Sequence, residues 1–102
     1  MNARSKAGPG PSRYKEVRGL SRGLQVLRAM NGMAGGMGGV VEIAKAAGMH
    51  RTTAKRLLET LRREGLVDQR DENGPYVLTF EVRRLAEGYA GSDWIDRIAA
   101  PA

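Results

Sequence analysis

The sequence predicts a mainly α-helical domain with a small β-hairpin, arranged as a winged helix-turn-helix. Within residues 40–61, two short helical patterns meet at a glycine, Gly48. After them the period at which apolar residues recur changes from about 3.6 residues to about 2 residues, which indicates strands. Between the two short strand candidates, Asn73-Gly74 is a strong hairpin signal. A hairpin directly after the second helix of such a pair is typical of a winged helix-turn-helix.

The N-terminal part contains a tail, a helix and a loop. Residues 1–17 are rich in Gly, Pro, Ser, Lys and Arg, so we expect a flexible basic arm. Residues 20–31 form a helix with Ser21 as a plausible N-cap, and apolar side chains recur at helical spacing at Leu20, Leu24, Leu27 and Met30. Residues 32–39 contain five glycines and are expected to be a loop.

Residues 40–47 and 50–64 are the two helices of the predicted helix-turn-helix. Seven positions agree with the spacing of that motif, namely Ile43, Ala44, Ala47, Gly48, Met49, Ala54 and Leu57. The small Ala44 lets the two helix backbones approach closely. Gly48 can adopt the left-handed conformation of the turn, because it has no Cβ.

The C-terminal part predicts a hairpin and a further helix. Strands are expected over residues 66–70 and 76–80, with Pro75 at the start of the second because it cannot donate a ladder hydrogen bond. Residues 81–89 have helical periodicity. A last segment carries an apolar stripe with little left to pack on, made of Trp94, Ile95 and Ile98.

Positive charge is concentrated in the first two thirds of the chain. The net charge is +6; residues 1–63 carry 13 Lys and Arg against 3 Glu, whereas residues 64–102 carry 4 Arg against 8 acidic residues. Such an asymmetry indicates a polyanionic partner such as nucleic acid. An ordinary basic protein with solvated faces is the alternative on charge alone.

Several function classes are excluded or disfavoured by composition. There is no cysteine and a single histidine, His50, so neither a thiolate nor a histidine metal site is expected. The glycine-rich segment lacks the GK[ST] of a phosphate loop. We therefore expect no cofactor, no metal and no enzyme activity. No apolar run approaches the roughly 20 residues of a membrane span, and no signal peptide is evident, so a cytoplasmic location is expected.

The second helix of the motif opens with side chains suited to duplex DNA. An α-helix fits the major groove, where Arg and Lys can donate to guanine and Thr can contact a base or a phosphate. We expect Arg51, Thr52 and Lys55 to contact base edges. Phosphate contacts are expected from Thr53, Arg56 and Arg63, and further ones from Arg22 and Arg70.

Some of these residues have simpler structural interpretations. Arg62 and Arg63 could simply complement the negative end of the helix dipole instead of contacting DNA. Glu59 is better explained as an ion-pair partner of Lys55 or Arg63 than as an acceptor for cytosine. His50 is more typical of a helix cap than of a base-reading residue. The acidic tip of the hairpin, Asp71-Glu72, argues against its deep insertion into a minor groove.

Three segments resemble the N-terminal DNA-binding domain of the IclR family of bacterial transcriptional regulators. They are LSRGLQVL, VVEIAKAAGMHRTTAKRLLETLRREGLV and YVLTFEVRRLAEGY, which together cover roughly residues 17–90. The block GMHRTTAKRLLETL is specific, because generic winged helices do not share it. Within the family, VRGLSRGL, HRTTAKRLLETL and WIDRIAAP are most similar to regulators of 3-(3-hydroxyphenyl)propionate catabolism.

The resemblance implies sequence-specific binding to a palindromic promoter site by a homodimer or a dimer of dimers. It divides the chain into the arm (1–17), the winged helix-turn-helix (18–90) and the start of a linker helix (91–102). In the family this helix leads to a separate effector-binding domain, for which no residues remain here, so no effector site is expected in this chain. A winged helix used for protein interaction, and a nonspecific nucleic-acid binder acting through its arm, are the open alternatives.

Overall fold

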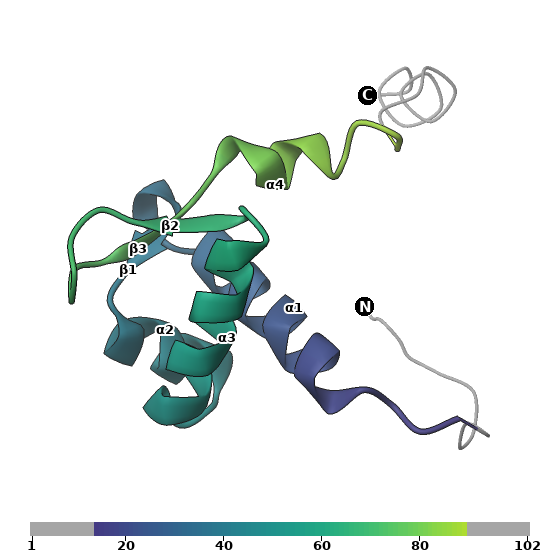
Figure 1. Ribbon diagram of the computed structural model, residues 1–102, viewed down its shortest axis with the longest axis horizontal. Helices are drawn as coiled ribbons and strands as arrows, with labels where there is room; N and C mark the ends of the chain where they lie inside the picture. Colours follow the sequence, from purple (N-terminus) through teal and green to yellow (C-terminus); the bar gives the residue numbers. More distant parts are fainter. Residues whose placement is uncertain (1–13, 90–102) are drawn as a thin grey trace, which may run out of the picture.

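The computed structural model describes residues 14–89 as three packed helices, a small sheet and a fourth short helix (Figure 1). In chain order the elements are α1 (Arg18–Asn31), the 3-10 turn η1 (Ala34–Gly36), β1 (Met37–Gly38), α2 (Val40–Ala47), α3 (Arg51–Arg63), β2 (Val67–Gln69), β3 (Tyr76–Leu78) and α4 (Phe80–Arg84). The predicted winged helix-turn-helix is confirmed.

One apolar core joins the first three helices to the sheet. Its fully or almost fully buried members come from α1, α2, α3, β2 and β3: Val26, Met30, Ile43, Ala44, Ala54, Leu58, Val67 and Tyr76. Ala44 and Ala54 are both small, which lets α2 and α3 approach closely where they cross. Burying apolar surface is the main force that orients these helices.

The turn between α2 and α3 has the predicted geometry. Gly48 ends α2 with φ 71° and ψ 39°, in the left-handed region that favours glycine. The N–H of Met49 donates to the carbonyl of Ala44, which closes the turn at 3.0 Å. His50 is then the N-cap of α3, because its Nδ1 accepts a 3.2 Å hydrogen bond from the N–H of Thr52.

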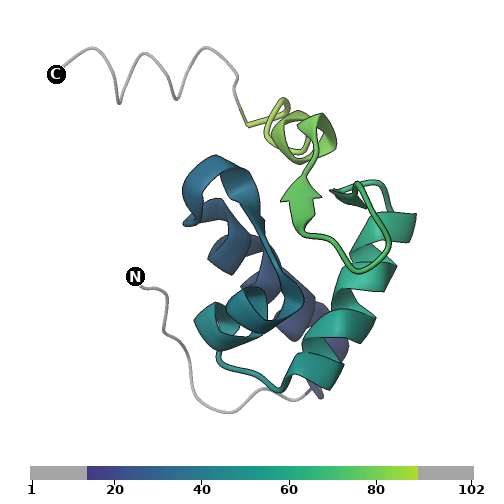
Figure 2. The same ribbon diagram turned by 90° about the vertical axis from the view of Figure 1, so that its left-hand side faces the viewer.

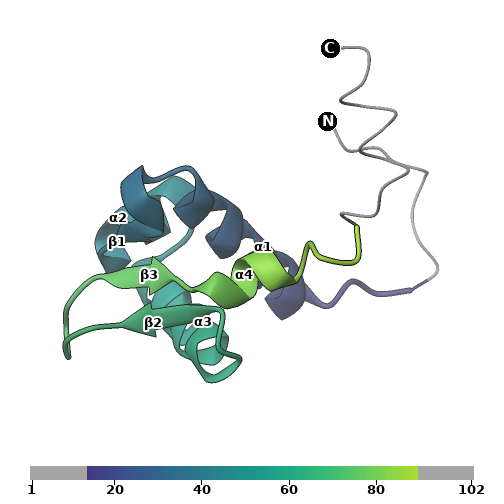
Figure 3. The same cartoon turned by 90° about the horizontal axis from the view of Figure 1, so that it is seen from above.

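The hairpin forms the wing, and Figure 3 shows its turn projecting from the body on the side away from the start of α1. Strands β2 and β3 pair antiparallel, with Gln69 opposite Tyr76 and Val67 opposite Leu78. Asn73 has φ 69°, and the N–H of Gly74 donates to the carbonyl of Asp71 at 2.8 Å. The hairpin predicted from Asn-Gly is thus confirmed.

The glycine-rich segment is only partly the loop that was expected. It contains η1 and β1, and β1 pairs antiparallel with β3, so that the sheet has three strands in the order β1-β3-β2. Gly38 is buried, and a Cβ there would lie 2.8 Å from Sδ of Met33. The missing side chain therefore allows this edge of the sheet to lie against the core.

Several predicted boundaries differ from those observed. Ser21 is not an N-cap, because α1 already begins at Arg18. The strands are shorter than predicted, and Phe80 begins α4 rather than ending β3. Thr79 explains that start: its hydroxyl accepts from the N–H of Glu81 at 3.2 Å and donates to the carbonyl of Gly65 at 2.6 Å. Helix α4 ends at Arg84, earlier than residue 89, and is followed by turns.

Parts of the expected organisation fall outside the described residues. These are most of the basic arm, the linker segment 91–102 and the apolar stripe around Trp94. Between residues 14 and 89, no helix has both the length and the apolar character to cross a membrane. The same residues contain no cluster of His, Asp or Glu that could hold a metal ion.

The two helices of the motif depend on the left-handed glycine between them. In Gly48→Ala the added Cβ lies in open space, but the alanine must adopt a left-handed backbone conformation that is strained for it. We therefore expect the free energy of unfolding to fall by about 1 kcal/mol. Gly23→Ala is the matched control in α1, where a Cβ also meets nothing but φ is helical; it should stabilise by about 0.5–1 kcal/mol. Urea unfolding of both variants tests this, and equal effects of the same sign would contradict it.

Candidate nucleic-acid interface

Helix α3 presents its basic face to solvent because its opposite face is buried. Ala54 and Leu58 are fully buried, and Leu57 and Leu61 pack partly against the same core. Side chains on the other side of the helix, including Arg51 and Arg56, are exposed. This arrangement follows from the 3.6-residue period, and Figure 2 shows α3 lying along one side of the molecule.

The first half of α3 lines a groove of about 570 Å³ together with the wing turn and the start of α2. Four of the predicted DNA-contacting side chains are brought together here: Arg51, Thr52, Lys55 and Arg56. Gln69, Asn73 and Gly74 line the groove from the wing. The groove therefore combines cationic and polar side chains from two elements that are far apart in the sequence.

A second, smaller hollow of about 290 Å³ lies between the start of α1 and α3. It brings together Arg22, Thr53 and Arg56, three residues predicted to contact phosphate. Arg56 lines both depressions, so the two form one cationic surface. Arg18 also lines this hollow and was missed, although it stands one helical turn before Arg22.

The two remaining predicted residues lie outside both depressions. Arg63 is exposed in the last turn of α3, and Arg70 is exposed just after β2. Arg62 is the arginine that pairs with Glu59, at 3.7 Å, rather than Arg63. The ion pair of Glu59 with Lys55, also 3.7 Å, agrees with the simpler interpretation of Glu59.

A hydrogen-bonded chain connects α3 to the wing strand β3. The Nζ of Lys55 donates to Oη of Tyr76 at 2.7 Å, and Oη donates in turn to Oε2 of Glu59 at 2.5 Å. The ammonium also lies 5.2 Å from the centre of the Tyr76 ring. Sequence patterns did not reveal this contact, because it joins residues 21 positions apart.

The pKa shifts of these three groups follow from the same contacts. The hydrogen bond to Tyr76 raises the pKa of Lys55, and the nearby Glu59 carboxylate adds to the effect. The Tyr76 hydroxyl lowers the pKa of Glu59, and Lys55 and Arg62 act in the same direction. Burial, followed by the bond to Glu59, raises the pKa of Tyr76. At neutral pH Lys55 is therefore an ammonium, Tyr76 a neutral phenol and Glu59 a carboxylate.

A further contact fixes the wing relative to the end of α3. Nη1 of Arg62 donates to Oε1 of Gln69 at 3.4 Å, and Nε2 of Gln69 donates to the carbonyl of Gly74 at 3.0 Å. Gln69 thereby bridges the helix and the hairpin turn. These bonds hold the wall of the groove that belongs to the wing.

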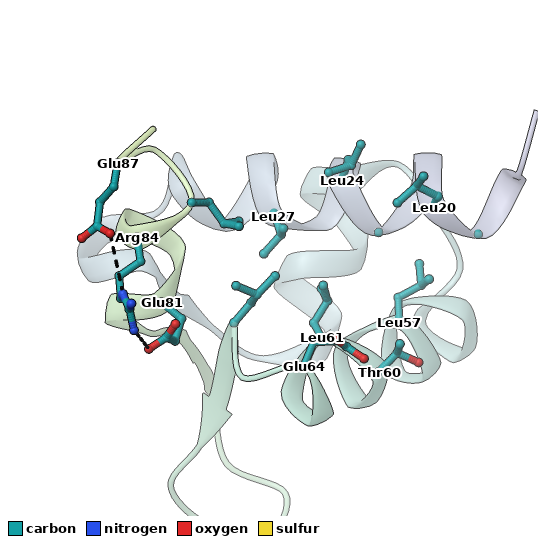
Figure 4. A pocket seen from close by; sticks show the side chains of 14 residues that line it. Leu20, Leu24, Leu27, Leu57, Thr60, Leu61, Glu64, Glu81, Arg84 and Glu87 are labelled. Atoms are coloured by element: carbon teal, nitrogen blue, oxygen red, sulfur yellow. Dashed lines mark hydrogen bonds and ion pairs between the residues drawn. The ribbon is translucent and has the colours of Figure 1, made fainter. Parts of the chain in front are cut away.

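An apolar groove, called the leucine groove below, lies on another face, between α1, α3 and α4 (Figure 4). It has a volume of about 790 Å³, and its apolar walls include Leu20, Leu24, Leu57 and Leu61. Leu20, Leu24 and the neighbouring Leu85 are 64%, 42% and 69% exposed. Three of the four residues in the predicted apolar stripe of α1 therefore line this groove, namely Leu20, Leu24 and Leu27. Leu27 also packs against the core, in which Met30 is buried.

Comparisons with known proteins agree with this geometry. The chain is 39% identical over 67 residues to the HTH-type transcriptional regulator Rv1719 of Mycobacterium tuberculosis, covering 66% of this chain and 26% of that protein. It is 35% identical over 75 residues to the glycerol operon regulatory protein of Streptomyces coelicolor, covering 74% and 29%. The chain thus spans less than a third of either relative.

A solved structure has the same arrangement of elements. The crystal structure of an IclR family transcriptional regulator from Brucella abortus superposes with a TM-score of 0.73 at 32% identity, covering 94% of this chain and 36% of that one. Residues 19–71, from α1 to the wing, match the IclR helix-turn-helix domain. The chain therefore belongs to the IclR family and carries the DNA-binding helix-turn-helix domain of these transcriptional regulators.

Proposed function

We propose that this domain binds duplex DNA sequence-specifically, with α3 in the major groove, and thereby regulates transcription. The observation that carries the proposal is the gathering of Arg51, Thr52, Lys55 and Arg56 along one groove beside the wing. The N-terminal residues of a helix in the major groove meet the base edges. A bacterial regulator of this kind acts in the cytoplasm, on the nucleoid.

Different side chains have different proposed tasks. Arg51, Thr52 and Lys55 contact base edges, because they lie in the first half of α3 and line the groove. Phosphate contacts come from Thr53, Arg56 and Arg63 of the helix and from Arg22 and Arg70 beside it. Thr53, Arg56 and Arg22 line the hollow at the start of α1, a position that suits the sugar-phosphate strand at the groove edge.

The helix N-terminus and the wing limit the mode of binding. The first N–H groups of a helix have no partner within the helix, but in α3 the N–H of Thr52 donates to His50. Phosphate binding at this helix end would therefore rely on the other N–H groups and on side chains. The wing turn carries Asp71 and Glu72, both exposed. Their repulsion of phosphate favours contact through the side of the wing, at Gln69 and Asn73, over insertion of its tip.

We further propose that two copies bind a palindromic operator. The leucine groove between α1, α3 and α4 supports this, because exposed Leu20 and Leu24 offer apolar surface that a second copy could cover. An operon for catabolism of an aromatic compound is the proposed target, and it rests on the similarity of VRGLSRGL, HRTTAKRLLETL and WIDRIAAP to regulators of such pathways.

A protein-interaction module and a nonspecific binder are the competing functions. The first requires an apolar or acidic surface on α3, whereas its exposed face is cationic. The second requires the basic arm to supply the binding. Selection of bound sequences from a random duplex pool separates the functions: an enriched inverted repeat supports specific binding by two copies, and no enrichment contradicts it.

Deleting residues 1–17 distinguishes the arm from the domain. The deletion removes positive charge but no part of α3, so we expect weaker binding with an unchanged ranking of sequences. Competition binding with the selected and a scrambled duplex measures both quantities. Complete loss of binding would instead support the nonspecific binder.

Base-contacting and phosphate-contacting arginines should behave differently. Arg51→Ala should cost about 1–3 kcal/mol on the selected duplex, concentrated at one base pair. Arg56→Ala should weaken binding to all duplexes alike and reduce the salt dependence by about one ion. Arg83→Ala, in α4, is a control with the same change of charge and should have little effect. Equal losses on selected and scrambled DNA for both Arg51→Ala and Arg56→Ala would contradict the assignment.

The leucine groove can be tested separately as a dimer surface. Leu85 is exposed, so Leu85→Glu should leave the fold intact while placing a charge at the proposed interface. Sedimentation should show a shift from dimer towards monomer, and binding to the inverted repeat should weaken more than binding to a half-site. A dimer unaffected by the substitution would exclude this surface.

A further inference from the structure

The hydroxyl of Tyr76 is a polar group at the end of a fully buried side chain. The residue has no exposed surface, and its ring is part of the core beneath the sheet. A buried phenol needs hydrogen-bond partners, and both of its partners here lie on α3, one helical turn apart: Lys55 and Glu59. A phenylalanine would fill the same core position without this connection.

The connection gives Lys55 a defined position that the neighbouring cations lack. Its Nζ is 2.7 Å from Oη of Tyr76 and 3.7 Å from Oε2 of Glu59. Within residues 14–89, by contrast, no hydrogen bond or ion pair restrains the side chains of Arg51 and Arg56. Fixing a flexible lysine side chain costs conformational entropy, so a lysine already fixed in the free protein loses less entropy on binding.

The geometry also leaves the ammonium able to donate to DNA. An ammonium has three N–H groups. One is directed to Tyr76 and a second side faces Glu59, while Lys55 still lines the groove beside Arg51 and Thr52. The carboxylate and the phenol are thus on the protein side of the ammonium, and the remaining donor is available to an acceptor in the groove.

We propose that Tyr76 is a positioning residue for sequence reading: its hydroxyl, bonded to Glu59, holds the ammonium of Lys55 so that a remaining N–H meets one base-edge acceptor. This inference rests on the proposed function. Tyr76 itself touches no DNA in this arrangement. It acts through Lys55, and it makes the wing strand contribute to the specificity of the helix.

A thermodynamic cycle of Tyr76→Phe and Lys55→Met tests the proposal. The readout is the ratio of affinities for the selected duplex and a scrambled duplex. Tyr76→Phe keeps the ring and the charge of Lys55, so we expect the ratio to fall roughly fivefold to tenfold while affinity for scrambled DNA stays within about twofold. Lys55→Met should lower the ratio at least as much. In the double variant, Tyr76→Phe should add no further loss, because its effect passes through Lys55.

Controls separate this role from a general loosening of the wing. Lys45→Met makes the same change of charge and side chain at an exposed position on α2, outside both depressions, and should leave the ratio unchanged. Thermal unfolding of each variant checks that it is folded. If Tyr76→Phe lowers the ratio equally with and without Lys55, its role is structural and the proposal is wrong.

Three outcomes would overturn it, and they can be told apart. Tighter binding of the Tyr76→Phe variant to all duplexes would mean that the contacts with Tyr76 and Glu59 keep Lys55 away from DNA. A wild-type chain that selects no sequence would overturn the proposed function together with this inference. A selective wild type whose cycle shows no coupling between Tyr76 and Lys55 would overturn the positioning role alone.

Discussion

Burial of one face of α3 is the constraint on which the rest of the molecule depends. Ala54 and Leu58 are fully buried, and together they fix how α3 is rotated about the helix axis. Truncating a buried leucine costs about 2–5 kcal/mol, a large share of the stability of a domain this small. No other rotation buries these residues, so the arginines, threonines and lysine of the opposite face must point outward.

The turn before α3 and the hairpin after it place that face in a usable setting. Gly48 and the His50 cap fix where the helix begins, while Gln69 connects the wing to Arg62 at its far end. The cationic surface therefore depends on short-range contacts at both ends of α3. Tyr76 adds a contact between them that both packs the core and holds Lys55.

The sequence was most informative where local chemistry decides structure. Apolar periodicity located the four helices, Gly48 located the turn, and Asn73-Gly74 located the hairpin, because each depends on neighbouring residues only. The strand β1 was missed, because its pairing with β3 depends on residues 38 to 40 positions away. The Tyr76 contact was missed for the same reason. Among the predicted DNA-contacting residues, six lie together, while Arg63 and Arg70 stand apart.

The most direct test is a map of backbone amide shifts on adding a short duplex that carries the selected site. The account predicts that the largest changes fall on residues 51–56, on the wing near Gln69 and Asn73, and at the start of α1. Changes confined to the leucine groove between α1 and α4, or none at low ionic strength, would show that the cationic face of α3 does not meet DNA.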